Sequence, residues 1–78
     1  MKKEHVIFNE TMGLYFVEWD SRPLLQQDGT WDKRAVWGRD FEAYKFDTKA
    51  EAQSERTTLR GLTLYRKHKI IVRRWLDA

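Results

Sequence analysis

The sequence predicts a small α+β domain, in which an antiparallel sheet of three to five strands carries one helix on one face. Short runs of aromatic and β-branched residues are separated by turn residues, which is typical of strands. Only one stretch combines helical spacing with a helix start signal. The chain has 78 residues, too few for two domains of ordinary size. We therefore expect a single domain over residues 1–78, in the order β-β-(β)-β-α-β.

The first two strands form the clearest hairpin in the sequence. Residues 5–8 are β-prone, and residues 14–19 are rich in aromatic and β-branched side chains. Residues 9–13 supply turn residues, and Gly13 can take a positive φ at little cost. This pattern predicts two antiparallel strands joined by a turn.

Residues 20–33 show no clear period and predict a long loop. Pro23 and the Asp28-Gly29 pair are turn signals. Loops of about a dozen residues are uncommon in small domains and are often functional or mobile. Two interpretations stay open for this segment. It is either a flexible insertion or a cover that folds back over the sheet through Leu24, Leu25 and Trp31.

Three more short strands are predicted, at residues 34–37, 43–46 and 69–76. The last of them is basic, and strand alternation divides its side chains between the two faces of the sheet. One face receives Ile70, Val72 and Leu76, and the other receives Lys67, Lys69, Ile71, Arg73 and Trp75.

The one helix is expected from about Lys49 to Arg60. Thr48 and Glu51 have the spacing of a capping box at its start. Gly61 stands where a residue in left-handed conformation often ends a helix. The apolar stripe is thin, which requires the helix to lie close against the sheet. It consists of Ala52, Leu59 and Leu62.

The aromatic residues divide between the two faces of the predicted sheet. The expected core set is Phe8, Phe16 and Phe46. The set expected on the other face is Tyr15, Val17 and Trp19, joined by Trp37 and Trp75. One helix cannot cover both faces, so the second face is expected to be a dimer interface or a partner site unless the long loop covers it.

The composition argues against an enzyme. The chain has no cysteine, which excludes disulfides, a thiolate nucleophile and the usual zinc-thiolate site. His5 and His68 are the only histidines, and two such ligands without a carboxylate cluster make a poor metal site. Glycine patterns that bind phosphate and serine patterns of hydrolases are missing from the sequence. We expect no catalytic residue, no cofactor and no metal.

The N-terminal segment predicts a cytoplasmic protein. Its apolar run covers only residues 6–8, whereas a signal peptide needs about 7–15 apolar residues and a membrane span about 20. We therefore expect no membrane contact.

The positive charge is concentrated in the second half of the chain. Residues 1–40 carry six Lys and Arg against seven Asp and Glu, whereas residues 41–78 carry nine against five. The basic last strand can bind an acidic protein surface or nucleic acid phosphates, or its long side chains can simply cover an open sheet face. The predicted partner-binding residues are Trp19, Trp31, Lys67, Lys69, Arg73, Arg74 and Trp75.

The chain resembles a group of short bacteriophage and prophage proteins. In these, a Gly-aromatic strand precedes a Trp, and an Ala-x-x-Phe-x-Thr-x-x-Glu-Ala run opens the only helix. The matching residues here are 13–15, Trp37 and the run 43–52, and the likeness spans about two-thirds of the chain. The loop at 20–33 departs from the pattern. The run 43–52 is also similar to the arm-type DNA-binding domain of tyrosine recombinases, which ends after its helix and lacks the basic last strand.

The phage resemblance implies a non-enzymatic module that inhibits or modulates a host protein by steric occlusion, in the manner of anti-CRISPR and other host-takeover proteins. Its partner would be a host protein in the host cytoplasm. The resemblance to recombinase domains implies the alternative function, nucleic-acid binding by the last strand. A homodimer through the uncovered face is a third expectation from the residues themselves.

Overall fold

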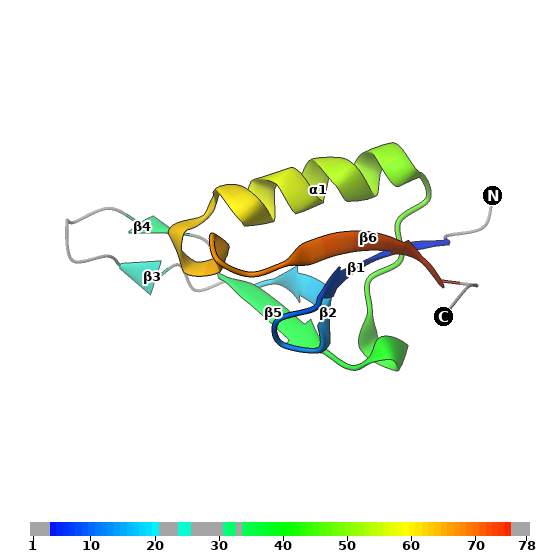
Figure 1. The fold of residues 1–78 in the computed structure, drawn as a ribbon, viewed down its shortest axis with the longest axis horizontal. Helices are drawn as coiled ribbons and strands as arrows, with labels where there is room; N and C mark the ends of the chain where they lie inside the picture. Colours follow the sequence, from blue (N-terminus) through cyan, green and yellow to red (C-terminus); the bar gives the residue numbers. More distant parts are fainter. Residues whose placement is uncertain (1–3, 21–23, 26–30, 33, 76–78) are drawn as a thin grey trace.

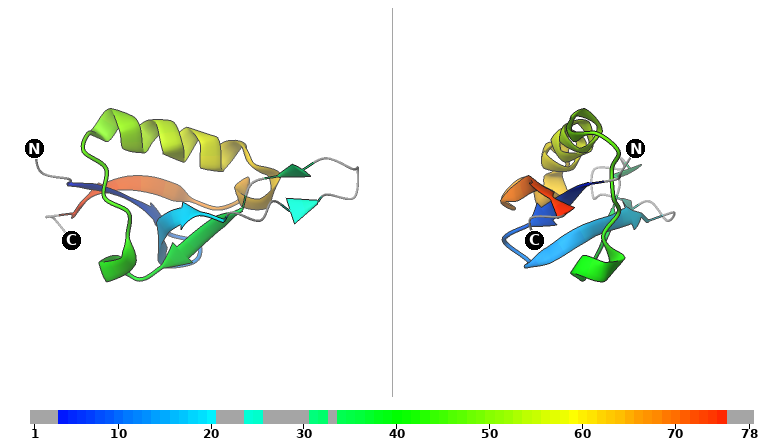
Figure 2. Two further views of the ribbon diagram at one scale, coloured as in Figure 1. Left: turned by 180° about the vertical axis from the view of Figure 1, so that it is seen from behind. Right: turned by 90° about the vertical axis from the view of Figure 1, so that its right-hand side faces the viewer.

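The computed structural model of the chain describes residues 4–20, 24–25, 31–32 and 34–75, with the backbone alone for 24–25, 31–32 and 63. Its four-stranded antiparallel sheet has the order β5-β2-β1-β6, and one α-helix crosses one face (Figure 1). The predicted α+β class is confirmed. The end-on view in Figure 2 shows α1 on one side of the sheet and the short helix η1 on the other.

The elements follow one another along the chain in the predicted order, with two short additions in the loop. The sheet strands are β1 (His5–Asn9), β2 (Leu14–Trp19), β5 (Ala35–Gly38) and β6 (Ile70–Arg74). The helices are η1 (Asp40–Glu42), α1 (Lys49–Gly61) and η2 (Thr63–Tyr65). A second, two-stranded sheet consists of β3 (Leu24–Leu25) and β4 (Trp31–Asp32).

The segment expected to be a plain loop at 20–33 therefore contains paired strands. Leu24 pairs with Asp32 and Leu25 pairs with Trp31. Both strands lie beyond the end of the main sheet, near the C-terminal end of α1 (Figure 1 and the left view of Figure 2). The described backbone of this segment does not lie across the sheet face opposite α1.

The predicted strand at 43–46 is wrong as a full strand, and its residues fill a gap in the sheet. β1 and β2 pair only through Phe8–Tyr15 and Asn9–Leu14, and then separate. The backbone of Tyr44 donates to Phe16 O at 3.0 Å, and the backbone of Phe46 donates to His5 O at 2.8 Å. Residues 44–46 thus bridge the two diverging strands and pair with each at single points.

A β-bulge in β2 reverses the alternation that the sequence predicted for its second half. β2 pairs with β5 through Phe16–Trp37 and then through Glu18–Val36, so one residue of β2 is skipped. The skipped residue shifts the side-chain alternation by one position. Trp19 therefore lies on the same side as Phe16, facing α1, whereas regular alternation places it on the opposite side.

The core lies between α1 and the sheet. Side chains from the sheet, α1 and η2 contribute to it, and the half-buried rings of Trp19 and Trp37 pack against it. Its buried members are Ile7, Phe16, Ala35, Phe46, Ala52, Leu59, Tyr65 and Ile70. The predicted helical stripe of Ala52 and Leu59 is confirmed as the buried side of α1.

The start of α1 is as predicted, whereas its end differs from the prediction. Thr48 is the N-cap, and its hydroxyl accepts a hydrogen bond from Glu51 N at 3.1 Å. Gly61, expected in left-handed conformation beyond the helix, is instead the last residue of α1, and Gly13 is the one described glycine with positive φ. Leu62 caps the C-terminus, with its N–H bonded to Leu59 O at 3.2 Å. None of the described helices is long and apolar enough to span a bilayer.

Candidate functional site

The face of the sheet opposite α1 carries a half-buried set of three apolar side chains and one basic side chain. Phe8 pairs with both Tyr15 and Ile71 across the sheet, so these three side chains project on the same side. Arg73 lies two residues beyond Ile71 and projects with it. All four are half-buried. The start of η1 lies on the same side of the sheet and lines a hollow together with Phe8 and Tyr15. We call Phe8, Tyr15, Ile71 and Arg73 the open face.

The side chains of the open face contact one another. The Phe8 and Tyr15 rings lie 4.8 Å apart at a 48° angle. The Arg73 guanidinium carbon lies 5.1 Å from the centre of the Phe8 ring, which is within cation–π range. The Phe8 ring therefore contacts both the Tyr15 ring and the Arg73 guanidinium, and it joins them into one patch.

One end of the open face is extended by a second pair of a cation and a ring. The Lys45 ammonium lies 4.3 Å from the centre of the Trp75 ring. Trp75 directly follows β6, and its N–H donates to the backbone oxygen of Glu4 next to β1. This hydrogen bond fixes Trp75 at the end of the sheet, where its ring stays half-buried.

The other end of the open face is hollowed. A depression of about 500 Å³ lies between the β1–β2 turn and the start of η1, and Phe8, Tyr15, Arg39 and Asp40 contribute to its lining. η1 is held in place because Glu42 Oε1 accepts a hydrogen bond from Arg39 N at 3.1 Å. The depression thus has aromatic residues on one wall and a basic and an acidic residue on the other.

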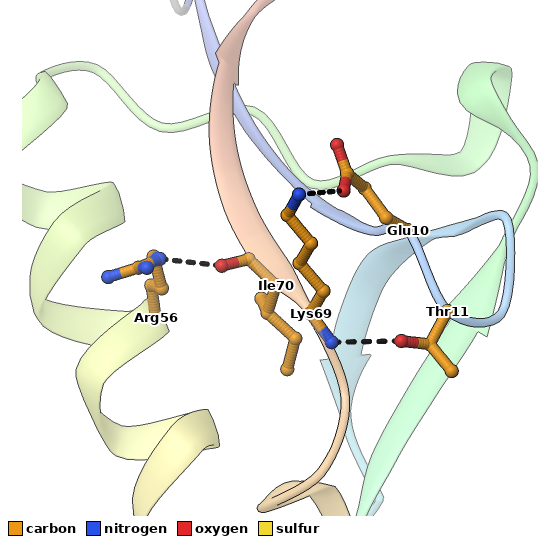
Figure 3. Close-up of polar contacts among 5 residues, drawn as sticks. All are labelled: Glu10, Thr11, Arg56, Lys69 and Ile70. Atoms are coloured by element: carbon orange, nitrogen blue, oxygen red, sulfur yellow. Dashed lines mark hydrogen bonds and ion pairs between the residues drawn. The ribbon is translucent and has the colours of Figure 1, made fainter.

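The basic last strand does not form the single face that the sequence predicted. Lys67 and Lys69 precede β6, so strand alternation does not govern their direction. The Lys69 ammonium lies 3.2 Å from Glu10 Oε2, and its backbone N–H donates to Thr11 Oγ1 (Figure 3). Arg74 pairs with Glu4 at 3.2 Å and projects with His5 on the helix side of the sheet.

Two of the predicted binding cations are therefore paired with glutamates that flank β1. Arg73 remains the one predicted cation within the open face. Figure 3 also shows that Arg56 of α1 reaches the Ile70 carbonyl at 2.7 Å, which fixes the helix against β6. Arg56 therefore connects α1 to β6 and lies away from the open face.

The tryptophans lie differently from the prediction. Trp19 packs edge-on against Phe16 at 5.4 Å, and its Nε1 donates to Glu55 Oε1 of α1 at 2.6 Å. Trp37 packs edge-on against Tyr65 at 5.4 Å, also on the helix side. Trp75 is thus the one described tryptophan at the open face. The side chain of Trp31 lies outside the described residues.

Phe8, expected in the core, is instead central to the open face. The sequence contained the signal for this placement, because a four-residue turn between Asn9 and Leu14 pairs Phe8 with Tyr15. Paired residues share a face, and Tyr15 was already expected on the open side. Lys45 and Arg39 were also missed, since neither lies in a predicted basic run.

The two histidines do not meet, although β1 and β6 pair. His68 Nδ1 lies 2.8 Å from the side-chain Nδ2 of Asn9, at one end of β1, whereas His5 lies at the other end. Among the described residues, no group of three or more His, Cys, Asp or Glu side chains could hold a metal ion.

Comparison with known proteins gives no match. No protein-family model matches the chain, and neither a curated protein nor a solved structure matches it significantly.

Proposed function

We propose that the chain is a non-enzymatic binding module that occludes a surface of a protein partner through the open face. The observation that carries this proposal is the half-buried patch of Phe8, Tyr15, Ile71 and Arg73 on the sheet face opposite α1. Aromatic residues and arginine dominate the energetics of protein interfaces. An apolar face of this kind on a small domain marks an interaction site.

The charges around the open face favour a protein partner over nucleic acid. Arg39 and Asp40 both border the hollow, so its rim carries charges of both signs. Lys69 and Arg74 are paired with glutamates. Nucleic-acid affinity depends on several cations that neutralise phosphates together, and these pairings reduce that number.

The identity of the partner rests on the resemblance to phage proteins. That resemblance makes a bacterial host protein the expected partner, and inhibition of a host defence or replication function the expected outcome. It also implies a phage or prophage origin for the chain and a site of action in the host cytoplasm. The open face supports only the proposal that the chain binds a partner; the proposed identity of that partner depends on the resemblance.

A single-stranded nucleic acid is the second candidate ligand for the same face. Phe8 and Tyr15 lie on the two central strands of a four-stranded sheet, and Arg73 lies beside them. A common RNA-binding fold stacks bases on aromatic residues of such a sheet. The Phe8 ring already contacts both Tyr15 and Arg73. A base that stacks on Phe8 would therefore have to replace one of these contacts.

Two charge-reversal variants test the protein-binding proposal. We expect Arg73→Glu to abolish capture of a specific protein from bacterial lysate, since Arg73 lies within the open face. Lys67→Glu changes the net charge equally but lies before β6, and we expect it to retain the same protein. Circular dichroism and the urea midpoint of each variant check that both are folded. Retention of the protein by both variants contradicts the assignment of the open face.

Salt dependence separates the two candidate ligands. If the ligand is single-stranded DNA or RNA, affinity for a fluorescent oligonucleotide should fall about a hundredfold or more between 50 and 200 mM salt. Both charge-reversal variants would then weaken binding. No measurable oligonucleotide binding at low salt would remove this candidate, and a salt-sensitive affinity lowered by both variants would favour it over the protein partner.

A further inference from the structure

A second hollow lies on the helix side of the molecule, away from the open face. It is enclosed by the end of β2, the bridging residues 44–46 and the middle of α1, and its volume is about 260 Å³. This is below the volume of about 300–1,000 Å³ that pockets for drug-sized ligands occupy, so the hollow suits a single chemical group. The lining residues on which its chemistry depends are Phe16, Trp19, Tyr44, Phe46 and Glu55.

Aromatic rings form most of this hollow. Phe16 contacts Trp19 at 5.4 Å and stacks with Phe46 at 6.5 Å, and Tyr44 lies edge-on to Phe46 at 4.8 Å. The Phe16 and Phe46 rings are buried in the core, whereas the Tyr44 side chain is half exposed at the rim. The lining is therefore a connected set of four rings that is open to solvent beside Tyr44.

The position of the Trp19 ring is fixed by Glu55, another lining residue of the hollow. Its Nε1 donates to Glu55 Oε1 at 2.6 Å, a short charge-assisted hydrogen bond between β2 and α1. The bulge in β2 turned Trp19 toward α1 in the first place. A ligand would thus meet rings that are already in place and would not have to order them on binding.

The charged residues that line the hollow are both acidic, and no Lys, Arg or His is among its described lining residues. The Glu55 carboxylate reaches the hollow from α1, whereas Glu18 pairs with Val36 and projects its side chain to the other face of the sheet. Lys45 lies between Tyr44 and Phe46 in the sequence, but its ammonium is directed to the Trp75 ring on the opposite side. This local negative charge stands out in a chain whose net charge is +3.

We propose that this hollow binds an organic ammonium group. Ring faces carry negative electrostatic potential and attract cations, and aromatic cages of this kind recognise quaternary ammonium ligands. The Glu55 carboxylate adds favourable charge, and the small volume limits the ligand to one head group such as trimethylammonium. This site and the open face have no residue in common, so the two proposals are tested independently of each other.

The decisive comparison is between choline and 3,3-dimethylbutan-1-ol, its neutral isostere with carbon in place of nitrogen. Each is titrated into the ¹⁵N-labelled protein, and the shifts of the Trp19 indole and Tyr44 amide signals are followed. We expect choline to saturate these signals with a millimolar Kd and the neutral isostere to bind about tenfold more weakly. Equal affinity for the two compounds, or no shift with choline, would overturn the proposal.

Variants of two lining residues localise the binding. We expect Tyr44→Leu and Glu55→Gln each to weaken choline binding severalfold, while Tyr15→Leu on the open face leaves it unchanged. Glu55→Gln removes the charge and keeps an oxygen that can accept the Trp19 hydrogen bond. The urea midpoint of each variant is measured as a folding control. If Tyr44→Leu folds and binds choline as the wild type does, the assignment of the hollow is wrong.

A last arm identifies the source of the ammonium group. A short peptide with a central trimethyllysine is compared with free choline and with the same peptide carrying norleucine. Tighter binding of the trimethyllysine peptide than of choline assigns the site to a protein side chain. Equal or tighter binding of choline assigns it to a small amine, and binding of the norleucine peptide at the same sites and affinity as the trimethyllysine peptide contradicts ammonium recognition.

Discussion

Gly13 and Gly61 are two glycines in different backbone conformations. Gly13 has a φ of 71° in the turn between β1 and β2. Gly61 ends α1, and its φ is not positive. An added Cβ would meet no atom within 4 Å at either position. Any difference between alanine variants at these positions therefore reports backbone conformation rather than side-chain clashes.

We expect Gly13→Ala to lower the free energy of unfolding by about 1–2 kcal/mol, the cost of a left-handed conformation in a residue with a Cβ. Gly61→Ala should leave it unchanged or raise it by up to about 1 kcal/mol, because alanine suits a helix better than glycine. Urea denaturation at a fixed temperature measures both. A loss of similar size in the two variants would contradict this explanation.

At the level of elements, α1 depends on its N-cap because its apolar stripe is narrow. Thr48 Oγ1 accepts the hydrogen bond from Glu51 N. Thr57 also makes a hydroxyl contact, but as a donor to Gln53 O within the same helix, at an exposed position. Only the first contact satisfies a backbone group that the helix itself leaves without a partner.

Replacing the two threonines separates capping from helix propensity. We expect Thr48→Ala to lower the free energy of unfolding by about 1 kcal/mol. Thr57→Ala should be neutral or slightly stabilising, since alanine is the better helix former and the lost bond is not needed. Thermal unfolding followed by circular dichroism at 222 nm compares them. An equal loss for both would show that Thr48 does not act as a cap.

The elements that could be predicted are those whose cause is local in the sequence. The turn at Gly13 and the cap at Thr48 depend on residues within four positions, and both are present in the structure. The bulge in β2 depends on how β5 pairs with it, and this pairing cannot be predicted from the residues of β2. The same holds for residues 44–46, whose role is set by the separation of β1 from β2.

This limit explains why the candidate site was only partly predicted. Arg73 and Trp75 lie at or beside the open face because β6 alternates regularly up to Arg74. Trp19 was assigned to the wrong face because the bulge shifts its alternation by one position. The partners of Lys69 and Arg74 come from Glu10 and Glu4, which are distant in sequence and close only after β1 and β6 pair.

On the scale of the whole molecule, the pairing of β1 with β6 connects the most distant parts of the described chain. His5 pairs with Arg74 and Asn9 pairs with Ile70, so the paired residues lie at least 61 positions apart. The Trp75 N–H donates to Glu4 O at the end of this pair. The two described ends of the chain are thus neighbours in space, on the same side of the molecule (Figure 1).

That adjacency makes the domain suitable for circular permutation. Joining residue 78 directly to residue 1 turns β6 and β1 into a hairpin. Opening the chain between Met12 and Gly13 then increases the sequence separation of only one strand pair, the two-residue β1–β2 pairing. Folding rates rise as contacts become more local, so the permutant should refold faster than the parent, although its stability falls with the loss of the turn. Stopped-flow tryptophan fluorescence measures both rates. An unchanged refolding rate would mean that β1 meets β6 only after the rate-limiting step.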